Sequence, residues 1–241
     1  MPADYSIIIP AYNEQTMLAR TLNSLNAAMA GIALRGEVIV TDNNSTDATA
    51  DIARTHGAAV VFEPINQISR ARNTGARQAS GRYLIFVDAD TRVEPALLQQ
   101  AIDNLASGQC CGGGALVDFD TPLTRAARFG LESWNRLSAR MRLAAGCFVY
   151  CLQEDFTACG GFSEKVYASE EIWLSRCLKR RGKNFGRDFR IISSPRAVSS
   201  GRKLVWYNIW QQLVLLIVLT VFPFAVRYKL LCGFWYQRPR S

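Results

Sequence analysis

The sequence has a single histidine, His56, and no pair of cysteines with the C-x-x-C spacing. Zinc sites in proteins are built from such cysteines and histidines, so the composition argues against a zinc centre. No leader of basic and apolar residues precedes the first apolar run, Ser6 to Pro10, so we expect no secretory signal. The chain also lacks internal repeats and low-complexity segments, which argues against a solenoid and a flexible tether.

Seven cysteines are present, an odd number, and most of them stand in apolar surroundings. Without a secretory signal, this pattern predicts reduced thiols in a cytosolic compartment. Their simplest role is that of small buried hydrophobic side chains. The cysteines are Cys110, Cys111, Cys147, Cys151, Cys159, Cys177 and Cys232.

Positive charge is spread unevenly along the 241 residues, which have a net charge of +8 and are 49% hydrophobic, enough for one core and a small appended region. Ten basic residues lie between Arg176 and Lys203, with Asp188 as the single acid. Nothing there resembles a nucleic-acid module, so we expect no nucleic-acid partner. The stretch fits an anionic membrane or a phosphorylated substrate, or it is a solvated helix face.

Short apolar runs alternate with helical patterns in the first ninety residues. Between the runs, leucines repeat at helical spacing, and Pro95 suits the first turn of a later helix. Such alternation predicts an α/β fold: a Rossmann-like, mostly parallel sheet with helices on both faces. The predicted strands are Ser6 to Pro10, Glu37 to Thr41, Ala58 to Phe62 and Tyr83 to Val87.

Polar motifs follow three of these strands directly. They are Tyr12-Asn13-Glu14, Asp42-Asn43-Asn44 and Asp88-Ala89-Asp90. Parallel sheets bind ligands at the carboxyl ends of their strands, so we expect the motifs to form one site. Two carboxylates one residue apart at a strand end fit a divalent metal that holds a diphosphate.

The pattern is looser beyond Pro95. We predict strands over Cys110 to Asp118 and Gly146 to Leu152, and helices over Thr121 to Arg142 and Glu170 to Arg181. The three glycines from Gly112 are not a phosphate loop, because no Lys-Ser/Thr and no helix start follow them.

Four ordered blocks resemble glycosyltransferase family 2. They are SIIIPAYNE, VTDNNSTDAT, ARNTGARQASGRYLIFVDAD and GGFSEKVYASEEIWLSRCLKRRGK, and together they extend from Ser6 to Lys183. The resemblance implies the A-type glycosyltransferase fold and a reaction that inverts the anomeric centre. Family motifs of this kind describe the donor side of the site better than the acceptor side.

The resemblance also implies which residues bind the nucleotide. By position, Pro10, Ala11 and Glu14 would line the nucleotide pocket, and Asp42 would form a hydrogen bond with a uracil ring. The alternative for Asp42 is a cap for the turn that enters the next helix.

Three further positions match family residues around the ribose and the diphosphate. Arg72 would contact the nucleotide, Asp88 the ribose, and Asp90 would ligate Mg²⁺ or Mn²⁺. A guanidinium suits a diphosphate because it forms paired hydrogen bonds, and a metal stabilises the charge of the leaving group. The alternative for Arg72 is a surface salt bridge.

An inverting transfer needs a base on the acceptor side, and the family places it in a Glu-Asp pair. The matching pair is Glu170-Glu171, in which Glu171 takes the Asp position and is the candidate base, with Glu170 as its orienting partner. Adjacent carboxylates should raise one pKa, which suits a base near neutral pH. Which of the two is the base stays open, and the alternative is an acidic helix N-terminus.

The C-terminal segment has a different character. Residues 204–226 contain no charged side chain, but their purely apolar part, Leu213 to Val226, is too short for a full membrane span. We expect an apolar helix that lies on the inner face of the membrane or packs on the domain. The predicted division is a nucleotide-sugar-binding half (1–109), an acceptor-binding and catalytic-base half (110–203) and this tail (204–241).

These observations lead to one main functional prediction. The chain is expected to be an inverting, metal-dependent glycosyltransferase that uses a nucleotide-sugar, of the uridine diphosphate type, and a lipid-linked or cell-envelope acceptor. We expect it in the cytoplasm, peripheral to the inner face of the cell membrane. The alternatives are a catalytically silent scaffold with the same fold, and a nucleotidyltransferase, although the first loop PAYNE lacks the glycines and basic residues of that class.

Overall fold

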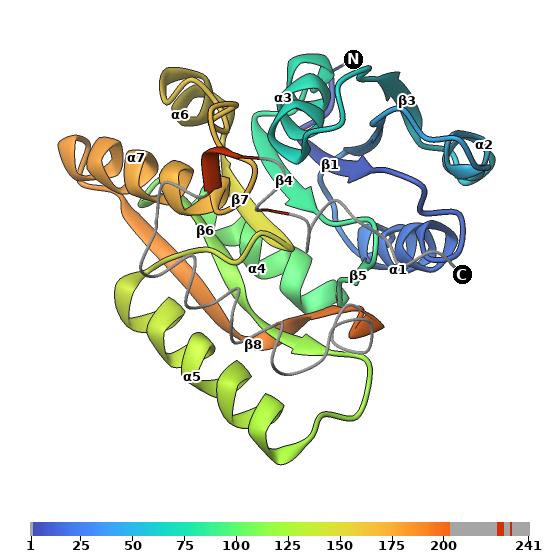
Figure 1. Cartoon of the computed structure of the whole chain (residues 1–241). Coiled ribbons are helices and arrows are strands. Elements are labelled where there is room, and N and C mark those ends of the chain that lie inside the picture. Colours follow the sequence, from blue (N-terminus) through green and yellow to red (C-terminus); the bar gives the residue numbers. More distant parts are fainter. Residues whose placement is uncertain (1, 203–225, 229–231, 233–241) are drawn as a thin grey trace.

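The computed structural model describes residues 2–202, 226–228 and 232. Strands and helices alternate along most of the chain, as Figure 1 shows; the exceptions are β5, which follows β4, and α7, which follows α6. The strands are β1 (Tyr5–Ala11), β2 (Gly36–Asp42), β3 (Ala59–Phe62), β4 (Tyr83–Val87), β5 (Thr91–Arg92), β6 (Cys110–Phe119), β7 (Phe148–Leu152) and β8 (Asp188–Ser199). The helices are α1 (Leu18–Met29), α2 (Thr49–Thr55), α3 (Ile68–Gln78), α4 (Pro95–Ala106), α5 (Arg125–Met141), α6 (Gln153–Ala158) and α7 (Glu170–Asn184).

The described strands form one eight-stranded sheet in the order β3-β2-β1-β4-β7-β6-β8-β5. Neighbours among β1 to β4 are parallel, and so are β6 and β8, whereas β7 is antiparallel to both β4 and β6. The predicted mostly parallel α/β sheet is therefore confirmed. The single sheet crosses the predicted boundary between the two halves, and the division by function stays a prediction.

Helices cover both faces of the sheet, because the strands are apolar on both sides. Ile7 and Ile9 of β1 point into a core that includes side chains of α1 and α4. Ile8, between them, points the other way and packs with residues of β4, α3 and α7. Alternate residues of a strand face opposite sides, so one continuous apolar run serves two layers of helices.

Element boundaries agree closely in the first half and less well in the second. The strand β4 has its predicted bounds, and Pro95 is the first residue of α4. The helix α5 begins four residues later than predicted, since the Thr124 hydroxyl accepts a hydrogen bond from Ala127 N–H at 3.3 Å and caps it there. The sequence did not predict β5, β8 or α6.

The tail lies mostly outside the described residues, and so does the predicted apolar helix. Of its described part, Val226 and Cys232 are buried against Val166 and Ala168, and the Val226 carbonyl accepts a hydrogen bond from Tyr167 N–H at 2.6 Å. This portion of the tail therefore packs on the domain. Within residues 2–202 and the described part of the tail, no helix is long and apolar enough to cross a membrane.

Candidate active site

The predicted donor residues lie in loops at the carboxyl ends of three neighbouring strands. Pro10 and Ala11 end β1 and are buried. Glu14 follows them, and its N–H donates to the Thr49 hydroxyl at 2.7 Å, which ties this loop to the start of α2. Asp42 ends β2, directly beside Ala11 in the register of the parallel pair. The expectation that these motifs converge at one edge of the sheet is met.

The Asp42 carboxylate has a structural contact of its own. Its Oδ1 accepts a hydrogen bond from Ser45 N–H at 3.0 Å, as expected of a cap for the turn that leads to α2. The neighbouring Asn43 amide is committed to the loop before α3: it donates to the carbonyls of Glu63 and Ile65 and accepts from Gln67 N–H. Hence Asn43 braces the loop, while Asp42 keeps a second oxygen for a ligand.

Arg72 is the centre of the site, not a surface residue. Its side chain on α3 is 1% exposed, so the alternative of a surface salt bridge is wrong. Nη1 donates to Glu170 Oε1 at 2.6 Å, and Nη2 donates to Asp88 Oδ1 and to the Gly146 carbonyl, both at 2.8 Å. The two carboxylates raise the pKa of Arg72, which stays charged despite its burial. One guanidinium thus joins a donor-side carboxylate to the predicted base pair.

The two glutamates at the start of α7 differ in their surroundings. Glu170 is 4% exposed and paired with Arg72. Among the described residues, Glu171 forms no ion pair with Arg72; its carboxylate accepts a hydrogen bond from its own backbone N–H, and the residue lines a cleft together with Glu170. Burial, and next the charge of Glu170, raise the pKa of Glu171 to about 8, whereas Arg72 acts in the opposite direction. Burial also raises the pKa of Glu170, with Arg72 opposing it.

The cleft beside Glu171 has a volume of about 420 Å³. Arg72, Asp88 and the two glutamates form its polar side. An apolar wall of the cleft comes from β6 and α5, which contribute Val117, Phe119, Leu131 and Trp134. A polar group with a raised pKa that faces an apolar wall is typical of a ligand cleft in which proton transfer occurs.

Sequence reasoning did not find this wall, nor Ser199 at the end of β8, which also lines the cleft. Trp134 lies within the helix predicted over Thr121 to Arg142, but no sequence pattern assigned it to a site. No local motif marks these residues, because they meet the carboxylates only through the pairing of β6 with β7 and β8.

Asp90, the predicted metal ligand, contacts an arginine that the sequence analysis did not single out. Arg202 Nη2 donates to Asp90 Oδ2 at 3.0 Å and to Glu14 Oε1 at 2.6 Å. Two carboxylate oxygens therefore converge on one atom, and such a donor set fits Mg²⁺ or Mn²⁺. In the described part of the chain, no cluster of three or more acidic, cysteine or histidine side chains could hold a metal, so water or phosphate oxygens would have to complete the site.

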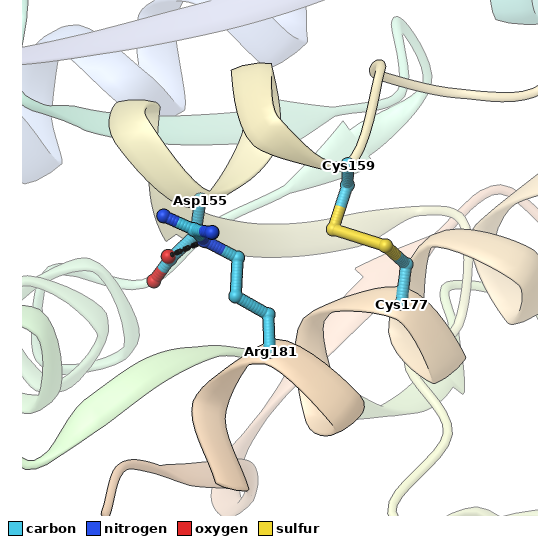
Figure 2. The surroundings of a disulfide bond; sticks show 4 residues. All are labelled: Asp155, Cys159, Cys177 and Arg181. Carbon is cyan, nitrogen blue, oxygen red and sulfur yellow. Dashed lines mark hydrogen bonds and ion pairs between the residues drawn. A yellow bond between two sulfur atoms is a disulfide. The ribbon is translucent and has the colours of Figure 1, made fainter. Parts of the chain in front are cut away.

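The helix α7 is fixed behind the site by a disulfide and an ion pair (Figure 2). Cys159, just after α6, is bonded to Cys177 of α7, with 5.9 Å between their Cα atoms. Arg181 pairs with the buried Asp155 of α6. The prediction that all seven cysteines are reduced is therefore wrong for this pair. The sequence did not indicate the bond, because the fold is what brings Cys159 and Cys177 together.

A disulfide also weakens the argument for a cytosolic compartment, which rested on reduced thiols. The other described cysteines are buried: Cys110, Cys111, Cys147, Cys151 and Cys232.

Comparison with known proteins identifies the family. The model of glycosyl transferase family 2 matches residues 6–151, which is more than half of the chain, and the chain belongs to this family. Glycosyltransferase AglE of Haloferax volcanii is 33% identical over 123 residues, covering 48% of this chain and 40% of AglE. Validoxylamine A glucosyltransferase of Streptomyces hygroscopicus subsp. jinggangensis is 36% identical over 104 residues, covering 40% of this chain and 24% of that enzyme. The chain spans less than half the length of these relatives.

Solved structures of glycosyltransferases share the fold. The mannosyltransferase PcManGT of Pyrobaculum calidifontis, in complex with GDP-Man and Mn²⁺, has a TM-score of 0.68 at 18% identity, covering 94% of this chain and 63% of its own. S. aureus TarS 1–349 with UDP-GlcNAc has a TM-score of 0.66 at 16% identity, covering 100% and 68%. The sheet and its helices therefore form an A-type glycosyltransferase fold.

Proposed function

We propose that the chain is the catalytic part of an inverting glycosyltransferase that takes a sugar from a nucleotide-sugar and transfers it to a lipid-linked or cell-envelope acceptor. One observation carries the proposal: Asp88, Arg72 and the Glu170-Glu171 pair share one cleft with an apolar wall. A single buried guanidinium, that of Arg72, thereby joins the proposed donor residue Asp88 to Glu170, the neighbour of the proposed base. Family membership supports the reaction class and argues against the nucleotidyltransferase alternative.

The nucleotide occupies the loops after β1, β2 and β4 in this proposal. Pro10, Ala11 and Asp42 line the base pocket for a uridine diphosphate donor, and Asp88 binds the ribose. Arg72 acts on the donor indirectly, because it orients the Asp88 carboxylate through the 2.8 Å hydrogen bond. TarS with UDP-GlcNAc has the same fold, which supports a uridine diphosphate donor, whereas PcManGT was solved with GDP-Man.

Glu171 is the proposed base. Its carboxylate removes the proton of the acceptor hydroxyl while the hydroxyl oxygen bonds to the anomeric carbon of the sugar. The bond from that carbon to the diphosphate breaks, and the nucleoside diphosphate leaves with the electron pair. Glu170 orients the pair, because Arg72 holds it, while Glu171 lines the cleft with a pKa of about 8. A pKa close to the working pH suits general base catalysis.

Asp90 would hold a Mg²⁺ or Mn²⁺ ion together with Glu14, which was expected in the nucleotide pocket but whose carboxylate shares Arg202 Nη2 with Asp90. Bound there, the ion would act as a Lewis acid on the diphosphate oxygens. Mn²⁺ is present in similar solved structures of two proteins, PcManGT and the glucosyl-3-phosphoglycerate synthase of Mycobacterium tuberculosis, the latter with UDP. The match to the synthase covers 90% of this chain and 79% of the synthase chain, with a TM-score of 0.60 and 18% identity.

Thermal unfolding with a panel of nucleotide-sugars, each with and without Mn²⁺, tests the donor proposal. A ligand at a hundred times its dissociation constant stabilises the folded state by about 2.7 kcal/mol, which is readily detected. We expect one uridine diphosphate sugar to raise the melting temperature of the wild-type chain, and Asp88→Asn to lose most of this effect. Absence of any response across the panel would contradict a donor site and favour the silent scaffold.

A membrane-bound acceptor is supported by the outer face of α5. Phe129, Leu137 and Met141 are 72%, 45% and 51% exposed on this helix, which presents an apolar stripe to the surface. Four arginines and one acid, Glu132, lie on the same helix. Amphipathic helices with this composition bind anionic lipid surfaces. Since Trp134 of α5 lines the cleft, an acceptor held in the lipid surface would lie close to Glu171.

Sedimentation of the whole chain with lipid vesicles tests this peripheral attachment at the inner face of the membrane. We expect binding to vesicles with phosphatidylglycerol and weaker binding to phosphatidylcholine alone. Phe129→Ser should reduce binding, whereas Phe62→Ser, an equally polar change at an exposed residue of β3, should not. Equal binding of wild type and both variants would rule out α5 as the contact.

A further inference from the structure

The contact between Arg202 and Asp90 is a built feature of the fold. Arg202 follows β8, whose last residues pair with β5 next to Asp90. Ser200 N–H donates to the Asp90 carbonyl at 3.1 Å, and Gly201 N–H donates to Asp120 Oδ1 at 3.0 Å. The turn that carries Arg202 is therefore fixed by one hydrogen bond to the main chain of Asp90 and one to the side chain of Asp120.

The ion pairs of Arg202 are well shielded from water. The exposed fractions of the three side chains are 16% for Arg202, 12% for Glu14 and 10% for Asp90. The two carboxylates raise the pKa of Arg202, so its guanidinium stays charged. Close ion pairs away from water are screened weakly by salt, and the contact has a well-defined geometry.

A metal ion and this guanidinium nitrogen compete for the same oxygens. Glu14 Oε1 and Asp90 Oδ2 both point at Arg202 Nη2, which is the position that a cation bound by the two carboxylates would take. The metal ion and the guanidinium are both positively charged and would repel each other at this position. The guanidinium also occupies the side of Glu14 Oε1 and Asp90 Oδ2 on which the metal would bind. Binding of Mg²⁺ or Mn²⁺ at Asp90 therefore requires the guanidinium to move away.

We propose that Arg202 and the divalent cation exchange at Glu14 and Asp90: Arg202 holds the two carboxylates before the donor binds, and it moves onto the diphosphate of the donor when the metal takes them. The inference rests on the proposed function. A guanidinium that leaves two carboxylate oxygens needs new anionic acceptors, and a diphosphate next to the metal offers oxygens with a matching geometry. The site thus keeps a cation on its acids whether or not the donor is bound.

Isothermal titration of the whole chain tests both halves of the exchange. We expect Arg202→Gln to bind Mn²⁺ alone about tenfold more tightly than wild type, because the competitor is gone. The same variant should bind UDP about tenfold more weakly at saturating Mn²⁺, because the diphosphate loses its partner. Each tenfold change corresponds to about 1.4 kcal/mol. Opposite signs for the two ligands are not expected of a residue with a merely structural role.

Two matched variants accompany this experiment. Arg196→Gln removes a two-bond pair between Arg196 of β8 and Glu132 of α5, outside the cleft, and should change neither constant. Arg202→Lys keeps the positive charge, and we expect it to restore most of the UDP affinity. If Arg202→Gln does not fold, Arg202→Lys replaces it in the Mn²⁺ titration. A lysine has fewer hydrogen-bond donors than an arginine, so Mn²⁺ should displace it from the two carboxylates more easily, and Arg202→Lys should bind Mn²⁺ more tightly than wild type.

The possible failures are distinguishable. Unchanged or weaker Mn²⁺ binding in Arg202→Gln would overturn the exchange, and so would unchanged UDP affinity. If the wild-type chain itself does not bind UDP at saturating Mn²⁺, the proposed uridine diphosphate donor is wrong. If wild type binds UDP and Arg202→Gln binds it equally, the donor proposal stands and the role of Arg202 is refuted.

Discussion

The two halves of the sheet are built differently. Up to α4, parallel strands alternate with helices, and the polar residues of the site follow their strands directly. From β6 onward, antiparallel β7 and the long strand β8 bring in residues that are far from the carboxylates in sequence. The first half presents short polar loops, whereas the second supplies an apolar wall and a buried acid pair. The proposed donor-binding residues are therefore placed by the local order of the sequence, whereas the proposed acceptor-binding residues are placed by packing between distant parts of the chain.

The largest expected effect separates catalysis from donor binding. Glu171→Gln should lower kcat by about 10² to 10⁴, because it removes the proposed general base and leaves the size of the side chain nearly unchanged. UDP affinity should stay within about twofold of wild type, because the proposed role of Glu171 is on the acceptor side. Steady-state kinetics and calorimetric titration measure the two quantities. Near-normal turnover of this variant would mean that another residue is the base, with Glu170 as the next candidate.

Breaking the link between the halves should cost stability. Arg72→Met leaves Glu170 and Asp88 without their shared cation, and loss of one partner in a buried pair costs about 3 to 5 kcal/mol. As a control, Arg54→Met removes an exposed pair with Asp51 and should have little effect. Urea unfolding of both variants measures the difference. A similar small change in both would mean that Arg72 does not hold the halves together.

The two halves should also respond differently to pH. With a pKa of about 8, Glu171 is mostly protonated at neutral pH, so kcat/KM should rise about tenfold per pH unit below that value and level off above it. UDP affinity, measured from about pH 7 to 9, should not follow this titration. A flat rate profile over the same range would contradict the raised pKa.

The same group sets a pH-dependent difference in stability. Its folded pKa lies above the ordinary value of 4.5, so the folded chain binds more protons than the unfolded chain between the two values. The stability from Glu171 is fully present below pH 4.5 and is lost as the pH rises through about 8. Glu171→Gln should therefore gain stability relative to wild type between pH 5 and 9, a trend that thermal unfolding detects. A difference independent of pH would exclude this linkage.

A smaller effect tests the apolar wall. Trp134→Ala should raise the KM for the acceptor roughly tenfold, as for a large aromatic residue at the centre of a contact, and leave UDP affinity unchanged. Trp173→Ala is the matched control, because Trp173 on α7 is 49% exposed and does not line this cleft. Equal KM values for both variants would remove Trp134 from the acceptor site.

The last comparison concerns stability alone and uses two glycines on helices of the two halves. A Cβ at Gly75 of α3 would lie 2.5 Å from Ile8 Cγ2 and 2.6 Å from Thr41 Oγ1, so Gly75→Ala should destabilise the fold by about 1 to 3 kcal/mol. A Cβ at Gly130 of α5 meets nothing within 4 Å, and Gly130→Ala should stabilise by up to about 1 kcal/mol. Destabilisation by Gly130→Ala would show that α5 packs more closely than the structure indicates.

Local sequence order determined most of the first half. Apolar runs fix β1 to β4, and the residues after them become loops at one edge, so Asp42, Asp88 and Asp90 were found from the sequence alone. The family blocks added Arg72 and the Glu170-Glu171 pair. The strand β8 was missed because charged and polar residues interrupt its apolar positions, and it is held by pairing with β6 and β5.

Only the tertiary structure decided how these groups are used. It buried Arg72 between Asp88 and Glu170, gave Glu171 the raised pKa, placed Trp134 in the cleft wall and set Arg202 on Asp90 and Glu14. It also joined Cys159 to Cys177. The physical reason is the same in each case. A strand or loop motif follows from neighbours in the sequence, whereas burial, ion pairing and the competition for a carboxylate depend on distances between residues far apart along the chain.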